Sequence, residues 1–229
     1  MDARVRFWAA VGIAGQVLFV VSVVIAGLWQ GDRYRVVEHT MSDMYAEGAP
    51  RGLLTALLIA LCGAATMAFA LGAVRPTFRP AGRYGAASTL LLMLSITALG
   101  DLLAPFEREG CRLADPGCSS SDQMTAGGIA DVVLSAIGIV AMIAFLFVSA
   151  AAMRRTPGWQ EWVRPTRWVG VGFVVLLVGY LVADAVDLGG LVQRLLAFFT
   201  TGFLAALGWG IRRAAAPAPS QGTAALAGP

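Results

Sequence analysis

The sequence predicts an all-α, polytopic membrane protein with six transmembrane helices in a compact bundle and both termini in the cytoplasm. Three observations predict this fold. The chain of 229 residues is 58% hydrophobic and only 14% charged, whereas soluble domains carry about 25% charged residues. It contains six apolar stretches, each with the roughly 20 residues that a helix needs to cross a bilayer. Its basic residues are all arginine, and they cluster in alternate loops.

The expected spans lie at about residues 7–29, 52–74, 85–105, 125–152, 167–187 and 190–211. The first apolar run is longer than the core of a secretory signal peptide, which has about 7–15 residues, so we expect it to stay on the protein as a helix. Only the short segment DLGG joins the last two spans, which predicts a tight helical hairpin. Residues 212–229 are rich in Ala, Pro and Gly and are expected to form a disordered cytoplasmic tail.

The arginine residues predict the orientation in the membrane, because cytoplasmic loops are rich in basic residues. Arginines precede the first span and follow the second, fourth and sixth spans. The loops after the first and third spans instead carry several acids. We therefore expect the protein to lie in the plasma membrane with these two acidic loops outside. The small net charge of +3 reflects this topology, and we expect no nucleic-acid partner.

Two cysteines share the second outer loop. Cys111 and Cys118 are separated by six residues that include Asp-Pro-Gly, and disulfides persist in compartments outside the cytosol. The sequence therefore predicts a disulfide, with two free thiols as the alternative. The spacing does not fit a zinc site, which needs more Cys or His ligands. Cys62 lies within the second span and is expected to be a small packing residue.

Ionisable side chains gather in the outer third of the expected bundle. Such residues are costly inside a membrane, and they usually face the bundle interior or a cavity. We therefore predict a polar cluster that opens outward, although an ion pair between Arg194 and Asp184 or Asp187, and a hydrated interfacial position for Asp101, are simpler alternatives. Asp131 has wholly apolar neighbours, so without a partner it would stay protonated and suit a general acid. The predicted cluster consists of Asp101, Asp131, Asp184, Asp187 and Arg194.

The first outer loop contains the only histidine, His39, close to Glu38, Ser42 and Asp43. A single histidine excludes bis-histidine haem ligation and a three-histidine zinc site, and we expect neither metal nor cofactor. A Ser-His-Asp triad within this loop is disfavoured, because neighbouring residues rarely reach the linear geometry that a triad needs. A simpler alternative is that Ser42 or Asp43 caps a short interfacial helix.

Several segments together resemble the bacterial and archaeal membrane family named domain of unknown function 998. They are HTMSDMYAEGAP in the first outer loop, GDLLAPFEREGC at the end of the third span and GLVQRL at the start of the sixth. The resemblance covers most of residues 7–211. It implies a six-helix bundle with Ser42 and Asp43 in the first loop. Family members often carry a histidine near the start of the fourth helix, where this chain has Asp131 as the nearest ionisable residue.

Three classes of function remain open. In an intramembrane enzyme, Asp131 or Asp101 would protonate a lipid or isoprenoid-like substrate in cyclase or isomerase chemistry, with His39 and Asp43 as base or orienting group. A proton-coupled transporter is disfavoured, because the inner half of the bundle has almost no ionisable residues. A non-catalytic assembly partner or lipid- or ligand-binding sensor would use the polar cluster for structure. We expect membrane lipids as partners and a hydrophobic small molecule as substrate. The sequence does not determine the oligomeric state. The residues expected to bind the substrate are Glu38, Ser42, Asp184, Asp187 and Arg194.

Overall fold

The computed structural model describes residues 3–215, apart from the side chain of Asp184. Within this range the structure is helical and contains no strand. Five helices are long and apolar enough to cross a membrane, and a bent pair of helices supplies a sixth span. These findings confirm the predicted multi-pass helical membrane protein. The spans are α1 (Ala3–Leu28), α2 with its continuation (Gly52–Ala81), the bent pair α4 (Arg83–Leu94) and Ile96–Leu103, α7 (Ala126–Arg155), α8 (Gln160–Ala183) and α9 (Gly189–Ala214).

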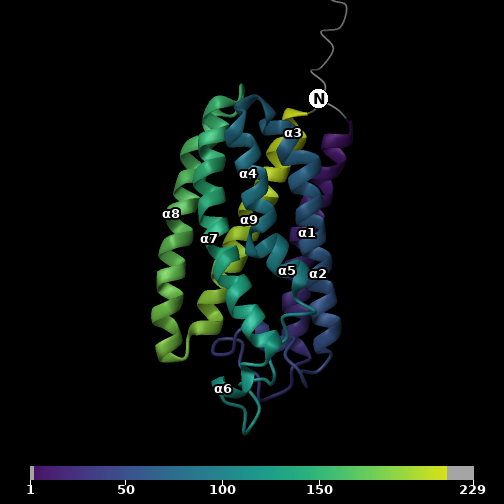
Figure 1. The fold of residues 1–229 in the computed structure, drawn as a ribbon, viewed down its shortest axis with the longest axis vertical. Helices are drawn as coiled ribbons and strands as arrows, with labels where there is room; N and C mark the ends of the chain where they lie inside the picture. The colour runs from purple at the N-terminus through teal and green to yellow at the C-terminus, as the bar shows by residue number, and fades with distance from the viewer. Residues whose placement is uncertain (1–2, 216–229) are drawn as a thin grey trace, which may run out of the picture.

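The six spans form a closed ring in which each packs against its neighbours in the chain (Figure 1). The ring closes because α1 contacts both α2 and α9. The connections after the second, fourth and fifth spans are short, which favours packing between neighbours in the chain, whereas the connections after the first and third spans are the two long acidic loops. The fifth and sixth spans form the predicted hairpin, with the short 3₁₀ helix η5 (Asp184–Val186) between them.

Both ends of the described chain lie at one end of the bundle, and the two acidic loops lie at the other (Figure 1). The arginine-rich connections after α2 and α7 share the end that holds the chain ends. This arrangement requires an even number of crossings. The assignment of the arginine-rich end to the cytoplasm stays a prediction from the sequence. Of the tail predicted at 212–229, the first three residues continue α9, and residues 216–229 lie outside the described residues.

The centre of the ring is filled by large side chains from all six spans. Phe69, Phe145 and Leu204 are each almost fully buried there, on α2, α7 and α9. A second cluster lies nearer the acidic loops and includes Phe19 and the loop residue Met44. Since lipid is as apolar as these side chains, close packing and hydrogen bonds between helices hold such a bundle together.

The third span is broken at Ser95, where the sequence predicted one continuous helix over 85–105. Ser95 has an extended backbone (φ −69°, ψ 161°), and the two halves are bent by 43°. After the break comes a π-helical segment, η4 (Ile96–Gly100), and then a single turn, α5 (Asp101–Leu103). Irregular backbone at membrane depth is tolerated where protein covers it.

Two glycines on neighbouring helices allow this covering. A Cβ atom at Gly63 on α2 would lie 2.3 Å from the backbone nitrogen of Leu102, and one at Gly138 on α7 would lie 2.7 Å from the Cα of Ile96. Both clashes are with backbone atoms, which have little room to move. Gly63 and Gly138 therefore let α2 and α7 approach the broken span from both sides.

We predict that Gly138→Ala lowers the stability of the detergent-solubilised protein by about 1–3 kcal/mol, because its methyl group overpacks the contact with Ile96. The matched control is Gly202→Ala on α9, where a Cβ would meet nothing within 4 Å. That control should be neutral or stabilise by up to about 1 kcal/mol, the difference in helix propensity. Thermal unfolding followed by circular dichroism measures both. Equal melting temperatures for the two variants would contradict the proposed role of Gly138.

Candidate functional site: an outer cap rich in carboxyl groups

The two acidic loops pack together over one end of the bundle. We call residues 29–51 and 104–125 the outer cap. Arg108 from the second loop donates through Nε to the carbonyl of Tyr45 (2.7 Å) and through Nη2 to that of Ala46 (3.0 Å) in the first loop. The backbone N–H of Glu47 donates to the carbonyl of Glu109 (2.8 Å). The loops therefore behave as one structural unit rather than as two independent connections.

The second loop also carries a disulfide and a local helix. Cys111 and Cys118 are bonded, with their Cα atoms 6.0 Å apart, as the sequence predicted. The short helix α6 (Ser120–Gln123) begins with a capping box, in which Ser119 and Asp122 satisfy each other's backbone N–H groups. Arg112, which is almost fully buried, donates to the carbonyl of Gln30 at the end of the first span (2.9 Å). These contacts fix the loop against the C-terminal end of α1.

Arg194 on α9 attaches the first loop to the sixth span. Its guanidinium is buried, with 6% of the residue exposed. It donates to the carbonyls of Val36 (2.7 Å) and His39 (2.9 Å) and to the hydroxyl of Tyr34. A Cβ at Gly190, one turn earlier, would lie 2.3 Å from the carbonyl oxygen of His39. The missing side chain at Gly190 thus gives the loop room to reach the guanidinium.

Carboxyl groups from both loops meet through a chain of hydrogen bonds. Ser42 Oγ donates to Glu109 Oε1 (3.0 Å), and Gln123 Nε2 donates to Glu109 Oε2 (2.8 Å). The same amide nitrogen lies 3.3 Å from Asp43 Oδ1, which also accepts from the backbone N–H of Leu113 (3.0 Å). Asp43 and Glu109 are thereby held on either side of a single amide group.

Tyr45 connects this chain to the membrane-spanning helices. Its hydroxyl group forms a hydrogen bond with the carboxyl group of Asp131 on α7. Asp131 is seven residues before Gly138, so the two residues lie on the same face of α7. This face packs against the broken span. Burial raises the pKa of Tyr45 well above its usual value, and the nearby carboxyl groups raise it further. These groups belong to Asp131, Glu109, Asp101 and Glu107.

Two carboxyl oxygens in the cap are buried without a hydrogen-bond partner among the described residues. They are Oδ2 of Asp43, a residue with no exposed surface, and Oε1 of Glu107, a residue 3% exposed. An unpaired buried carboxylate is very costly, and such a group takes up a proton instead. Neither residue forms an ion pair, since the ion pairs in the described chain are Arg35–Glu38 and Arg112–Asp115.

Burial accordingly raises the pKa values of three acids in the cap, Asp43, Glu107 and Glu109. The pKa of Glu107 rises to about 7, first through burial and then through the charge of Asp131. The pKa of Glu109 also rises to about 7 for the same two reasons, although the hydrogen bond from Ser42 lowers it. The pKa of Asp43 is raised by burial and lowered by backbone hydrogen bonds and by His39. The packed cluster therefore contains two carboxyl groups, those of Glu107 and Glu109, whose pKa values lie near neutral pH.

The structure gathers some of the residues predicted from the sequence and separates others. Asp43, Asp101 and Asp131 surround Tyr45 or its hydrogen-bonding chain. His39 lies farther along the loop, where Nδ1 is 3.0 Å from the backbone nitrogen of Arg35 and the ring stacks on Tyr34. Glu38 pairs with Arg35, and its carbonyl accepts from the backbone N–H of Gly190 (3.1 Å).

Two simpler interpretations of the sequence are wrong. Ser42 does not cap the short 3₁₀ helix η1 (Ser42–Met44), which has no side-chain cap, because its hydroxyl group is used by Glu109. Arg194 does not pair with Asp187, because its donors point to the first loop. Asp187 is exposed in the hairpin between α8 and α9, with a positive φ of 59°. The side chain of Asp184 lies outside the described part of the structure.

Sequence reasoning missed the residues that join the cluster together. Tyr45, Glu107, Glu109 and Gln123 were expected only to be loop residues. A usable signal for the two glutamates was their position directly after the third span, which predicts a place at the membrane edge. Within residues 3–215, no three His, Cys, Asp or Glu side chains are placed to hold a metal ion together.

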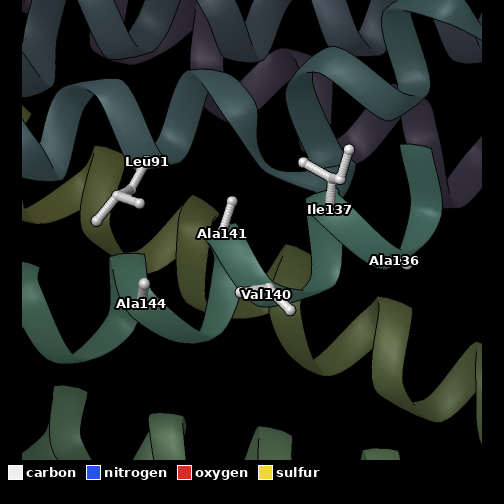
Figure 2. Close-up of a pocket in the computed structure, with 6 residues that line it drawn as sticks. All are labelled: Leu91, Ala136, Ile137, Val140, Ala141 and Ala144. Carbon is white, nitrogen blue, oxygen red and sulfur yellow. The ribbon is translucent and has the colours of Figure 1, made fainter. Parts of the chain in front are cut away.

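A shallow apolar groove of about 440 Å³ lies between α4 and α7 (Figure 2). Leu91 contributes the α4 side, and small and branched residues of α7 contribute the other. The groove faces outward from the bundle, as the exposure of Val140 and Ile137 indicates. Its lining residues are Leu91, Ala136, Ile137, Val140, Ala141 and Ala144.

Comparisons with known proteins give a family and nothing closer. A family model described as "Protein of unknown function (DUF998)" matches residues 13–210. No curated protein and no solved structure matches the chain. The matched region contains the outer cap, Asp131 and Arg194.

We predict that Arg194→Gln loosens the first loop, because three acceptors in that loop lose a charged donor and each such hydrogen bond contributes about 1.5–3 kcal/mol. Hydrogen–deuterium exchange should show faster exchange across residues 34–41, with the centres of α1 and α7 unchanged. The matched control is Arg35→Gln, which removes an exposed guanidinium from the same loop and should change exchange little. Equal exchange in the two variants would show that Arg194 does not hold the loop.

Proposed function

The chain belongs to the membrane protein family of unknown function DUF998, and from that premise we propose that it is a non-catalytic sensor whose outer cap responds to protons. One observation supports this proposal above all. The two cap loops meet through carboxyl groups that are buried without basic partners, and two carboxyl oxygens lack any partner in the described chain. A proton is the one cation that needs no cavity in order to bind there.

Protonation of these acids favours the closed cap. A protonated carboxyl group can donate a hydrogen bond, whereas adjacent carboxylates repel each other. In the proposed mechanism an acidic exterior keeps the cap closed and a neutral or alkaline exterior loosens it. Asp101 and Asp131 would carry the change into the bundle, because they lie on α5 and α7 beneath Tyr45. The proposal includes the plasma membrane as location and the cap on its outer side.

The charged and titratable groups that face the cluster come from every element packed against it. The basic ones are occupied elsewhere: Arg108 and Arg194 donate to carbonyl groups, and Arg112 binds Gln30 and Asp115. Among the described residues, these groups include Tyr34, His39, Asp43 and Tyr45 from the first loop, Cys62 from α2, Asp101 from α5, Glu107, Arg108, Glu109, Arg112 and Asp115 from the second loop, Asp131 from α7 and Arg194 from α9.

We predict that the cap is more protected from hydrogen exchange at pH 5 than at pH 8, after correction for the intrinsic exchange rate. In the closed cap Glu107 and Glu109 have pKa values of about 7, raised from 4.5, so the closed cap binds protons more tightly than the open one. The stabilisation of the closed cap by these protons is therefore fully present below pH 4.5, and it is lost as the pH rises through about 7. The loss is at most on the order of 3 kcal/mol for each glutamate.

Two variants make this test specific. In Glu107→Gln/Glu109→Gln the neutral amides imitate the protonated acids, so residues 42–47 and 107–113 should stay protected at pH 8. The matched control Glu47→Gln alters an exposed acid of the same loop and should keep the pH dependence. The proposal fails if the wild-type cap is equally protected at both pH values, or if the double variant keeps the transition.

A second candidate is the intramembrane enzyme that the sequence also suggests. It is favoured by the hydrogen bond between Tyr45 and Asp131, together with two glutamates whose pKa values of about 7 suit general acid–base work near neutral pH. The apolar groove between α4 and α7 (Figure 2) matches the chemistry of a lipid or isoprenoid-like chain. In this candidate Asp131 would act as general acid, supported by Asp101 and Asp43.

For the enzyme candidate, Asp131→Asn should remove a product from the lipid profile of cells that express the protein, because the amide cannot give up a proton as an acid does. The matched control Asp187→Asn changes an exposed aspartate in the hairpin between α8 and α9 and should leave the profile as in wild type. Mass spectrometry of total lipid extracts measures both. An unchanged profile in Asp131→Asn would rule against the enzyme and leave the sensor.

A further inference from the structure

The outward face of α8 carries a second groove, at the opposite end of the bundle from the outer cap. It has a volume of about 410 Å³ and follows the first three turns of the helix. Two arginines and a tryptophan stand among apolar neighbours along it. The lining residues are Gln160, Val163, Arg164, Arg167, Trp168 and Val171.

The two arginines of this groove lie nearer the start of α8 than Trp168 and Val171. Arg164 and Arg167 are three residues apart and so neighbour each other on one face. Trp168 and Val171 follow toward the middle of the membrane, and Val171 is about 10 Å along the axis from Arg164 at 1.5 Å per residue. Trp168 is 62% exposed, although α8 packs against α7 and α9 on its other sides. The groove therefore faces lipid.

Neither guanidinium has an ion-pair partner within residues 3–215, where the two ion pairs lie in the outer cap. The only acidic residue between α7 and the middle of α8 is Glu161. Elsewhere at this end, arginines stack on aromatic rings, as Arg155 does on Tyr84 and Arg213 on Trp209. Arg164 and Arg167 thus present two uncompensated positive charges at the level where lipid headgroups lie.

We propose that an anionic phospholipid binds in this groove, with its phosphate between Arg164 and Arg167 and an acyl chain along Trp168 and Val171. Guanidinium groups bind phosphate oxygens through paired, charge-assisted hydrogen bonds. A net negative headgroup is favoured over a zwitterionic one, because the cationic part of the latter would face two arginines. Tryptophan side chains are enriched at this level of a membrane, since the ring is amphipathic.

The test uses the full chain reconstituted in nanodiscs of phosphatidylcholine with a minor fraction of phosphatidylglycerol that carries brominated chains. Bromine quenches tryptophan fluorescence at short range. We expect brominated phosphatidylglycerol to quench the protein more than an equal fraction of brominated phosphatidylcholine. This excess should be lost in Trp168→Phe, which identifies the ring concerned among six tryptophans.

Two arginine variants decide whether the groove binds lipid. In Arg164→Gln/Arg167→Gln the excess quenching should disappear, and native mass spectrometry should show phosphatidylglycerol retained roughly tenfold more weakly. The matched control Arg75→Gln/Arg79→Gln removes two exposed arginines at the same end of the bundle and should keep both signals. Both variants alter exposed side chains, and a monodisperse elution profile verifies that each is folded.

Two results would overturn the proposal. Excess quenching that persists in Arg164→Gln/Arg167→Gln would show that these arginines do not hold the lipid. An equal loss in both double variants would show that the general positive charge of this end, rather than the groove, attracts phosphatidylglycerol. Neither result bears on the proton-responsive cap, which lies at the other end of the bundle.

Discussion

The structure depends on one constraint: the carbonyl groups of its outer loops must find donors at the edge of a membrane. A buried carbonyl without a donor costs about as much as a lost hydrogen bond, and these loops contain little regular helix. Three arginines supply the donors. Arg194 serves the carbonyls of Val36 and His39, Arg108 those of Tyr45 and Ala46, and Arg112 that of Gln30.

This use of the arginines determines the state of the acids around them. A guanidinium occupied by main-chain carbonyls is not free to neutralise Glu107, Glu109 or Asp131, and none of these has an ion pair among the described residues. The acids face one another and Tyr45 instead. Like charges in close contact disfavour ionisation, so protons take the place of missing cations. In the proposed sensor, the response of the cap to pH would follow from how its backbone is satisfied.

The sequence predicts the elements that depend on composition and misses those that depend on contacts between distant residues. Six spans, the hairpin of α8 and α9 and the bond between Cys111 and Cys118 follow from hydropathy, loop length and compartment. The break at Ser95 has no proline or glycine at that position to indicate it, and the glycines that make room for it, Gly63 and Gly138, lie on other helices. Arg194 was expected to pair with an aspartate nearby in the chain. Besides the carbonyl of Gly190 one turn earlier, its carbonyl acceptors lie in the first loop, more than 150 residues away in the chain, and no local sequence pattern predicts them.

The broken third span is also the mechanical connection between the cap and the bundle. Glu107 follows α5 by four residues and Asp101 begins it, so the second loop joins the broken span through a single turn of helix. Beyond that turn, η4 lies between Gly63 on α2 and Gly138 on α7, where the close contacts are with backbone atoms. Because the span is broken at Ser95, α5 and η4 pack against α2 and α7 independently of α4, whose own contact with α7 lies on the other side of the break.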